Sequence, residues 1–140
     1  MKQIFADTFY WIALTDSKDE WHSSVKKVTL SLGNFRIVTT DEVIGEFLNH
    51  FSEKGRFWRD KSVTLVKAIQ SNSNITVVPQ TRQSFLDGLK MYQERGDKGY
   101  SFVDCVSMNT MRERGLTEIL THDHHFTQEG FTILLTDKAE

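Results

Sequence analysis

Short β-like runs alternate with longer amphipathic segments along this chain, and this alternation restricts the possible folds more than any other feature. The β-like runs lie at residues 4–6, 36–39, 75–78, 118–121 and 131–135. No tight-turn dipeptide joins two neighbouring runs, so the sequence gives no sign of β-hairpins. Strands separated by helices pair in parallel through crossover connections. We therefore expect an α/β fold, a three-layer α/β/α sandwich with a mostly parallel five-stranded sheet.

Between the runs, apolar residues recur at intervals of three and four positions, which is the period of one helix face. This pattern predicts helices near residues 8–14, 21–32, 43–51, 58–70, 85–92 and 101–114. Thr39 and Glu42 have the spacing of a capping box at the start of the third helix. No repeat, linker or low-complexity tract interrupts the pattern, so we expect one domain over residues 1–140.

The composition excludes several classes of protein. Hydrophobic residues make up 39% of the chain and charged residues 26%, which is typical of a soluble globular domain. No apolar run is long enough to span a membrane, and residues 1–5 lack the apolar stretch of a signal peptide. The single cysteine, Cys105, rules out an internal disulfide. We therefore expect a cytoplasmic protein that does not associate with membranes.

The formal net charge of −2 argues against a protein that binds nucleic acid mainly through bulk positive charge. It remains compatible with a nuclease, because a cluster of catalytic acids lowers the net charge and a bound divalent ion restores part of it locally. The positions of the acids along the chain are therefore more informative than the net charge.

Four acids lie at places that a parallel sheet could bring together. Asp7 directly follows the first run, and Asp123 comes shortly after the fourth. Glu46 lies on the helix after the second run, and Asp104 lies in the first turn of its helix. Ligands of open α/β sheets bind beyond the carboxyl ends of the strands, so this edge is the expected site.

Carboxylates that converge repel one another unless protons or a cation neutralise them. Oxygen ligands favour hard cations such as Mg²⁺ or Mn²⁺ over zinc. Such an ion can activate a water for attack on a phosphodiester and can stabilise the charge that develops on the phosphate. The four acids therefore indicate a divalent-metal site that could serve phosphodiester hydrolysis.

Each acid also has an ordinary structural interpretation. Asp104 could favour the helix N-terminus through the helix dipole, and Asp123 could cap a short turn before Phe126. Glu46 could be a solvated helix residue. Asp7 is harder to explain in this way, because an acid at the end of a buried strand needs a partner.

Four segments of the chain resemble the PIN-domain family, in the family's order. Residues 4–9 read IFADTF, an apolar strand that ends in Asp7 and a hydroxyl residue. Residues 39–47, TTDEVIGEF, carry Glu46. Residues 97–105, DKGYSFVDC, carry Asp104, and residues 120–126, LTHDHHF, carry Asp123. Each motif is short, and it is the four together that make the resemblance specific.

The resemblance is strongest to the VapC-like toxins of toxin–antitoxin pairs. It implies a parallel-sheet domain, Mg²⁺ or Mn²⁺ as cofactor, an RNA substrate, a small antitoxin protein as partner, and a homodimer. It assigns the catalytic and metal-binding roles to Asp7, Glu46, Asp104 and Asp123. Thr8, Ser101 and Thr121 align with hydroxyl residues that flank the acids, and we expect them to hydrogen-bond carboxylates or waters.

Other functions remain open at this point. The chain could be an RNA-processing nuclease that is not a toxin, or a non-catalytic module that binds RNA or protein on the same fold. A phosphohydrolase with an aspartate nucleophile is less well supported, because Phe9 stands where a D-x-D pair would place its second Asp. Substitution of Asp7 separates the enzymes from the non-catalytic module, since binding by the module would not depend on this acid.

Two further clusters have alternative interpretations. His122, His124 and His125 are too close in sequence to converge on one zinc ion, and a solvated loop is the simpler interpretation, although one of them could contact a substrate phosphate. A basic stretch around Phe57 and Trp58 could contact RNA, could form a solvated turn, or could flank a groove for the antitoxin.

Overall fold

Five strands form one sheet in the order β3-β2-β1-β4-β5 in the computed structural model, which describes residues 1–138. The strands are β1 (Lys2–Ala6), β2 (Phe35–Thr40), β3 (Ile75–Val78), β4 (Glu118–Leu120) and β5 (Thr132–Ile133). Every neighbouring pair is parallel. The expected α/β/α sandwich with a five-stranded sheet is therefore confirmed, and the sheet is parallel throughout.

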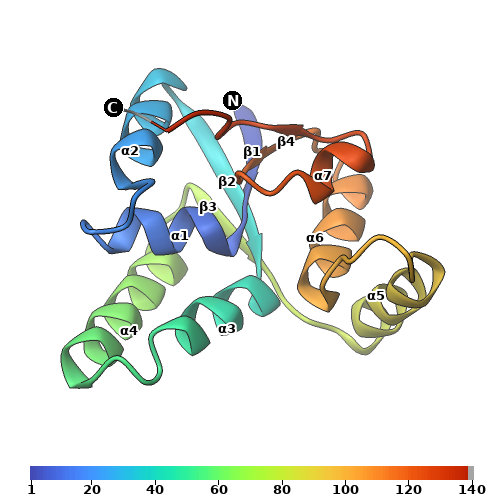
Figure 1. Cartoon of the computed structure of the whole chain (residues 1–140), viewed down its shortest axis with the longest axis horizontal. Helices are drawn as coiled ribbons and strands as arrows, with labels where there is room; N and C mark the ends of the chain where they lie inside the picture. The colour runs from blue at the N-terminus through green and yellow to red at the C-terminus, as the bar shows by residue number, and fades with distance from the viewer. Residues whose placement is uncertain (139–140) are drawn as a thin grey trace.

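Helices cover both faces of the sheet. They are α1 (Thr8–Thr15), α2 (His22–Ser31), α3 (Asp41–His50), α4 (Arg56–Ser71), α5 (Arg82–Glu94), α6 (Phe102–Glu113) and α7 (His125–Gln128). Figure 1 shows α1, α2 and α4 on one side of the strands and α5 and α6 on the other. No helix within residues 1–138 is long and apolar enough to cross a membrane.

The direction of strand addition reverses next to β1, and this positions the site. From β1 the chain adds β2 and β3 on one side, then returns to place β4 and β5 on the other. The gap beyond the carboxyl ends of β1 and β4 is thus a topological switch point, where open α/β sheets bind ligands. The register pairs Ala6 with Leu120, so Asp7 and Thr121 emerge side by side.

The central strand is apolar without alternation because helices cover both of its faces. Ile4, Phe5 and Ala6 have no exposed surface. Phe47 of α3, Met108 of α6 and Phe126 of α7 are equally buried and belong to the same core. The residues that lead to the site therefore lie on a rigid part of the molecule.

The cap of α3 differs from the sequence prediction. Thr40, and not Thr39, is the N-cap, and its hydroxyl accepts a hydrogen bond from the Val43 backbone N–H at 3.1 Å. The strand continues one residue further than predicted, so the buried Thr39 hydroxyl instead donates to the Ala6 carbonyl oxygen at 2.9 Å. The predicted capping box was wrong because Thr39 and Thr40 both have a hydroxyl that could cap the helix, and the sequence does not distinguish between them.

The last third of the chain also differs in detail. β5 is confined to two residues, and α7 forms where the sequence pattern gave a loop. The apolar residues that identified α5 do not form its buried face, because Leu89 and Tyr92 are exposed. The buried residues of α5 are Gly88 and Met91. Gly88 has no side chain, and this allows α5 to approach α6 closely.

Candidate active site

The four acids lie around one cleft of about 410 Å³ at the switch point. They come from four separate elements: the end of β1, helix α3, the first turn of α6 and the loop after β4. Residues from several elements form the wall of this cleft: Asp7, Thr8, Phe9, Ile12, Glu46, Gly99, Ser101, Asp104, Thr121, Asp123 and His125. The folded chain thus brings together all seven residues that the sequence marked as candidates.

Asp7 is the most buried of the four acids. Only 6% of the residue is exposed, and the Thr121 hydroxyl donates a hydrogen bond to its Oδ2 at 3.0 Å. Burial, followed by the negative charges of Asp104 and Glu46, raises the pKa of Asp7 to about 7, although hydrogen bonds from Thr8 and Thr121 oppose the rise. The ionised form therefore lacks a neutralising partner in the protein.

Asp104 is held by the start of α6. The Ser101 backbone N–H donates to Asp104 Oδ2 at 3.0 Å, and the Asp104 backbone N–H donates to Ser101 Oγ at 3.0 Å. This is a capping box, so the N-terminal role suggested by the sequence is real. Burial raises the pKa of Asp104 and the charge of Asp123 adds to the rise, while the Ser101 hydrogen bond and His125 lower it.

Asp123 and Glu46 complete the acid set from two further elements. The Asp123 backbone N–H donates to Thr121 Oγ1 at 3.2 Å, and Asp123 Oδ1 accepts the His125 backbone N–H at 2.9 Å. Glu46 is half-buried on α3. The predicted turn at Asp123 exists, but it also aims the carboxylate into the cleft.

Of the three predicted hydroxyl partners, Thr121 bonds a carboxylate directly, because its hydroxyl donates to Asp7. The Ser101 hydroxyl instead accepts the Asp104 backbone N–H, and it is the Ser101 backbone N–H that donates to the Asp104 carboxylate. The Thr8 hydroxyl is buried in the cleft and has no hydrogen-bond partner among residues 1–138. An unpartnered hydroxyl beside the acids is compatible with the predicted contact to a water.

His125 belongs to the cleft, and sequence analysis did not single it out from its neighbours. Its Nδ1 lies 3.5 Å from Asp104 Oδ2 and 3.3 Å from Asp123 Oδ1. His124 is exposed, whereas His122 bonds the Leu135 carbonyl oxygen and packs on Trp21. The solvated-loop interpretation therefore fits His124 alone. The missed signal is the short helix α7, which begins at His125 and fixes its ring.

The donor atoms fit a divalent cation. One ligand atom each from Asp104, Asp123 and His125 lies within 4.8 Å of the other two. The acids around them carry raised pKa values, so the protein alone does not neutralise their charge. Neither His122 nor His124 belongs to this group of possible ligands within residues 1–138.

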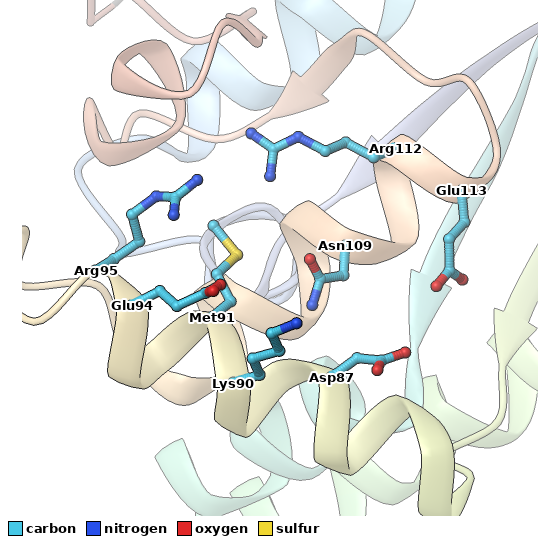
Figure 2. A pocket seen from close by; sticks show the side chains of 8 residues that line it. All are labelled: Asp87, Lys90, Met91, Glu94, Arg95, Asn109, Arg112 and Glu113. Carbon is cyan, nitrogen blue, oxygen red and sulfur yellow. The ribbon is translucent and has the colours of Figure 1, made fainter.

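A second hollow of about 300 Å³ lies between α5 and α6, and its side chains carry both signs of charge. Figure 2 shows Arg95 and Arg112 reaching toward the same side of this hollow from two different helices. Both guanidinium groups contact the Glu129 carboxylate, at 3.1 Å and 2.7 Å. These cations are therefore already engaged, and the hollow lacks the convergent acids of the first cleft.

The basic stretch around Phe57 forms the beginning of α4. Arg56 pairs with Asp60 on the helix surface, and Arg59 donates to the Ser52 carbonyl oxygen. Phe57 is 67% exposed, and Lys61 lies over its ring. These residues therefore lie on a helix and not in a solvated turn, and none of them lines the catalytic cleft.

The family model described as PIN domain matches residues 4–131, nearly the whole chain. The chain belongs to the PIN-domain family. This PIN domain is 26% identical over 128 residues to the 23S rRNA-specific endonuclease VapC20 from two strains of Mycobacterium tuberculosis, covering 91% of this chain and 95% of that protein.

Solved structures support the same assignment. The crystal structure of M. tuberculosis VapC20, a toxin that cleaves the sarcin–ricin loop, aligns with a TM-score of 0.81 at 26% identity. That alignment covers 92% of this PIN domain and 96% of VapC20. PAE2754 from Pyrobaculum aerophilum aligns with a TM-score of 0.60 at 18% identity, covering 95% and 90% of the two chains, and so shares the fold.

Proposed function

We propose that this PIN domain is a divalent-metal-dependent endoribonuclease with Asp7, Glu46, Asp104 and Asp123 as its catalytic acids. The observation that carries the proposal is the convergence of these acids from four elements in one cleft. The similarity to an endonuclease that acts on 23S rRNA supports RNA as the substrate class.

The acids would hold Mg²⁺ or Mn²⁺, because a set dominated by carboxylate oxygens suits hard cations. When bound, the ion supplies positive charge to the phosphate oxygens and polarises a water for attack. The pKa of about 7 for Asp7 supports this assignment, since a cation in the cleft would favour the ionised carboxylate at neutral pH.

The chain's own residues orient the acids. The Thr121 hydroxyl, the Ser101 backbone N–H and the His125 backbone N–H each donate to one of three carboxylates. These donors belong to the backbone or to a buried hydroxyl, so they hold the carboxylates with little freedom. Such positioning favours reaction of one phosphodiester in a fixed orientation.

We further infer that the chain is the toxin of a toxin–antitoxin pair, acting in the cytoplasm as a homodimer with a small antitoxin protein as partner. VapC20, to which it is similar along nearly its whole length, is named as a toxin. The similarity to a protein named as a toxin is the reason to look for a separate antitoxin.

The test is cleavage of total RNA and of an RNA that contains the sarcin–ricin loop, with Mg²⁺, with Mn²⁺ and with EDTA. Asp104→Asn should abolish cleavage, while the matched variant Asp97→Asn, an exposed acid outside the cleft, should retain it. Products should carry a 5′-phosphate and a 3′-hydroxyl. Cleavage that persists in EDTA or in Asp104→Asn would refute the metal-dependent mechanism.

The second candidate is a module on the same fold that binds RNA without cleaving it. The orphaned Thr8 hydroxyl and the raised pKa values of the acids favour the enzyme instead, because both indicate a ligand in the cleft. RNA binding that is equal in EDTA and in Mg²⁺, and unchanged in Asp7→Asn, would identify the non-catalytic module.

A further inference from the structure

The imidazole of His125 is placed between two of the four acids. Its Nδ1 lies 3.5 Å from Asp104 Oδ2 and 3.3 Å from Asp123 Oδ1. Two ligands in adjacent positions around a six-coordinate ion with bonds of ~2.1 Å lie about 3 Å apart. The two distances from Nδ1 are therefore close to the separation of adjacent ligands of one ion, and all three ligand atoms lie within 4.8 Å of one another.

The Nδ1 atom makes no hydrogen bond with residues 1–138 and is inaccessible to solvent. The two nearest carboxylate oxygens lie at 3.3 Å and 3.5 Å, which is long for an N–H···O bond. A buried nitrogen without a hydrogen bond costs free energy. A cation that accepts the nitrogen lone pair and both carboxylates would resolve the arrangement.

The surrounding loop fixes this ring orientation. Tyr100 packs edge-on against His125 with ring centroids 5.3 Å apart, and the Tyr100 hydroxyl is anchored on the Glu129 carboxylate at 2.9 Å. Gly99 has a φ of +75°, a conformation that side-chain-bearing residues rarely adopt, and a Cβ at this position would lie 3.8 Å from His125 Nε2. His122 and His124 have no comparable placement toward the acids.

We propose that His125 is a nitrogen ligand of this metal centre and that it makes the site selective for Mn²⁺ over Mg²⁺. The inference rests on the metal centre of the proposed function and specifies its ion. Imidazole nitrogen is a favourable ligand for transition metals, whereas Mg²⁺ strongly prefers oxygen and retains its waters. A site of carboxylates alone would discriminate less between the two ions.

The experiment uses Mn²⁺ as the probe. Pulsed electron paramagnetic resonance of Mn²⁺ bound to the wild-type protein should show nitrogen-14 coupling from a directly bound imidazole. His125→Phe keeps an aromatic ring against Tyr100 but has no ligand atom, so the coupling should disappear. His124→Ala removes the exposed neighbouring histidine and should leave the spectrum unchanged.

Calorimetric titrations with Mn²⁺ and Mg²⁺ give the second readout. His125→Phe should weaken Mn²⁺ binding by about tenfold or more, and Mg²⁺ binding by less than about threefold, which lowers the selectivity. Mn²⁺ binding to the wild type without nitrogen coupling would overturn the proposal, as would an unchanged selectivity in His125→Phe. Because the spectrum of the wild type decides the point, poor folding of the variant cannot obscure it.

Failure of the proposed function would look different. In that case neither Mn²⁺ nor Mg²⁺ would bind at the cleft of the wild type. Titrations of the wild type and of Asp104→Asn would then be indistinguishable. A wild type that binds Mn²⁺ through Asp104 but not through His125 would instead leave the carboxylate centre intact and reject the histidine alone.

Discussion

Thr121 donates a hydrogen bond of 3.0 Å to Asp7 across 114 residues of sequence, and both side chains are buried. The parallel register of β1 and β4 creates this contact, because Ala6 lies opposite Leu120 and the next residue on each strand leaves the sheet. The same hydroxyl accepts the Asp123 backbone N–H at 3.2 Å. Thr121 therefore links two of the proposed catalytic acids.

Replacement of Thr121 by valine should weaken metal binding while the fold is kept. Valine has the same shape but cannot donate to Asp7 or accept from Asp123. We expect Mn²⁺ affinity to fall by about 10- to 100-fold, as for other partners that orient metal ligands, and stability to fall by about 1–2 kcal/mol. Calorimetric titration and urea unfolding measure both effects. Thr121→Ser, which keeps the hydroxyl, should behave much like the wild type, and equal affinities for all three proteins would contradict the prediction.

Asp7 should make the metal-free protein less stable as the pH rises. Its pKa is about 7 when folded and 3.8 ordinarily, so the folded state binds the proton more tightly. The contribution of Asp7 to stability is therefore fully present below about pH 3.8 and is lost as the pH rises to about 7, by on the order of 2–4 kcal/mol. Asp7→Asn cannot ionise, so in EDTA at pH 8 it should be more stable than the wild type.

Urea unfolding between pH 4.5 and pH 8 measures this difference. Asp104, Glu46 and Asp123 face Asp7 from other elements, and comparison of the variant with the wild type isolates the part due to Asp7. Added Mn²⁺ should stabilise the wild-type protein at pH 8, because the ion binds the ionised carboxylate. The same addition should have little effect on the stability of Asp7→Asn. A wild type that is more stable than Asp7→Asn at pH 8 in EDTA would show that the carboxylate is already neutralised.

Glu129 should contribute strongly to stability at neutral pH. Burial alone would raise the pKa of this carboxyl, but hydrogen bonds from Arg95, Arg112 and Tyr100 lower it from 4.5 to about 2. Its contribution is therefore present above pH 4.5 and lost as the pH falls toward 2. We expect Glu129→Gln to destabilise the protein by about 2–4 kcal/mol at pH 7, since both arginines lose their partner.

Unfolding by urea at pH 7 and pH 3 tests the role of Glu129. The difference between the wild type and Glu129→Gln should be smaller at pH 3 than at pH 7. Glu94→Gln, an exposed acid at the end of α5, serves as the control and should change stability by less than about 0.5 kcal/mol. An equal decrease in the free energy of unfolding in both variants would mean that the contacts of Glu129 with Arg95 and Arg112 do not contribute to stability.

Two glycines inside helices should respond in opposite ways to alanine. A Cβ at Gly88 would lie 2.7 Å from Val106 Cγ2 and 3.1 Å from Phe102 Cε1, so Gly88→Ala must push α5 from α6 and should cost about 1–3 kcal/mol. A Cβ at Gly45 of α3 meets nothing within 4 Å, so Gly45→Ala should stabilise by about 0.5–1 kcal/mol. Thermal unfolding compares them, and stabilisation by both substitutions would disprove the close packing.

The sequence alone determined the order of the strands and of the six longer helices along the chain, and the location of the four acids among them. Periodicity, caps and breakers are local signals, so β1, α3 and α6 could be predicted within a few residues. The positions of Asp7 and Asp104 followed from the same signals, because each acid lies at an element boundary. Local signals failed where two neighbours carried the same one, as at Thr39 and Thr40.

Only the tertiary structure decided which side chains meet. The contact between Thr121 and Asp7 depends on the register of two strands that are more than a hundred residues apart, and no local pattern encodes that register. His125 enters the site because α7 and Tyr100 fix its ring, although its sequence neighbours His122 and His124 have the same chemistry. Local preferences set the elements, whereas the burial of apolar surface between them sets the distances on which the chemistry depends.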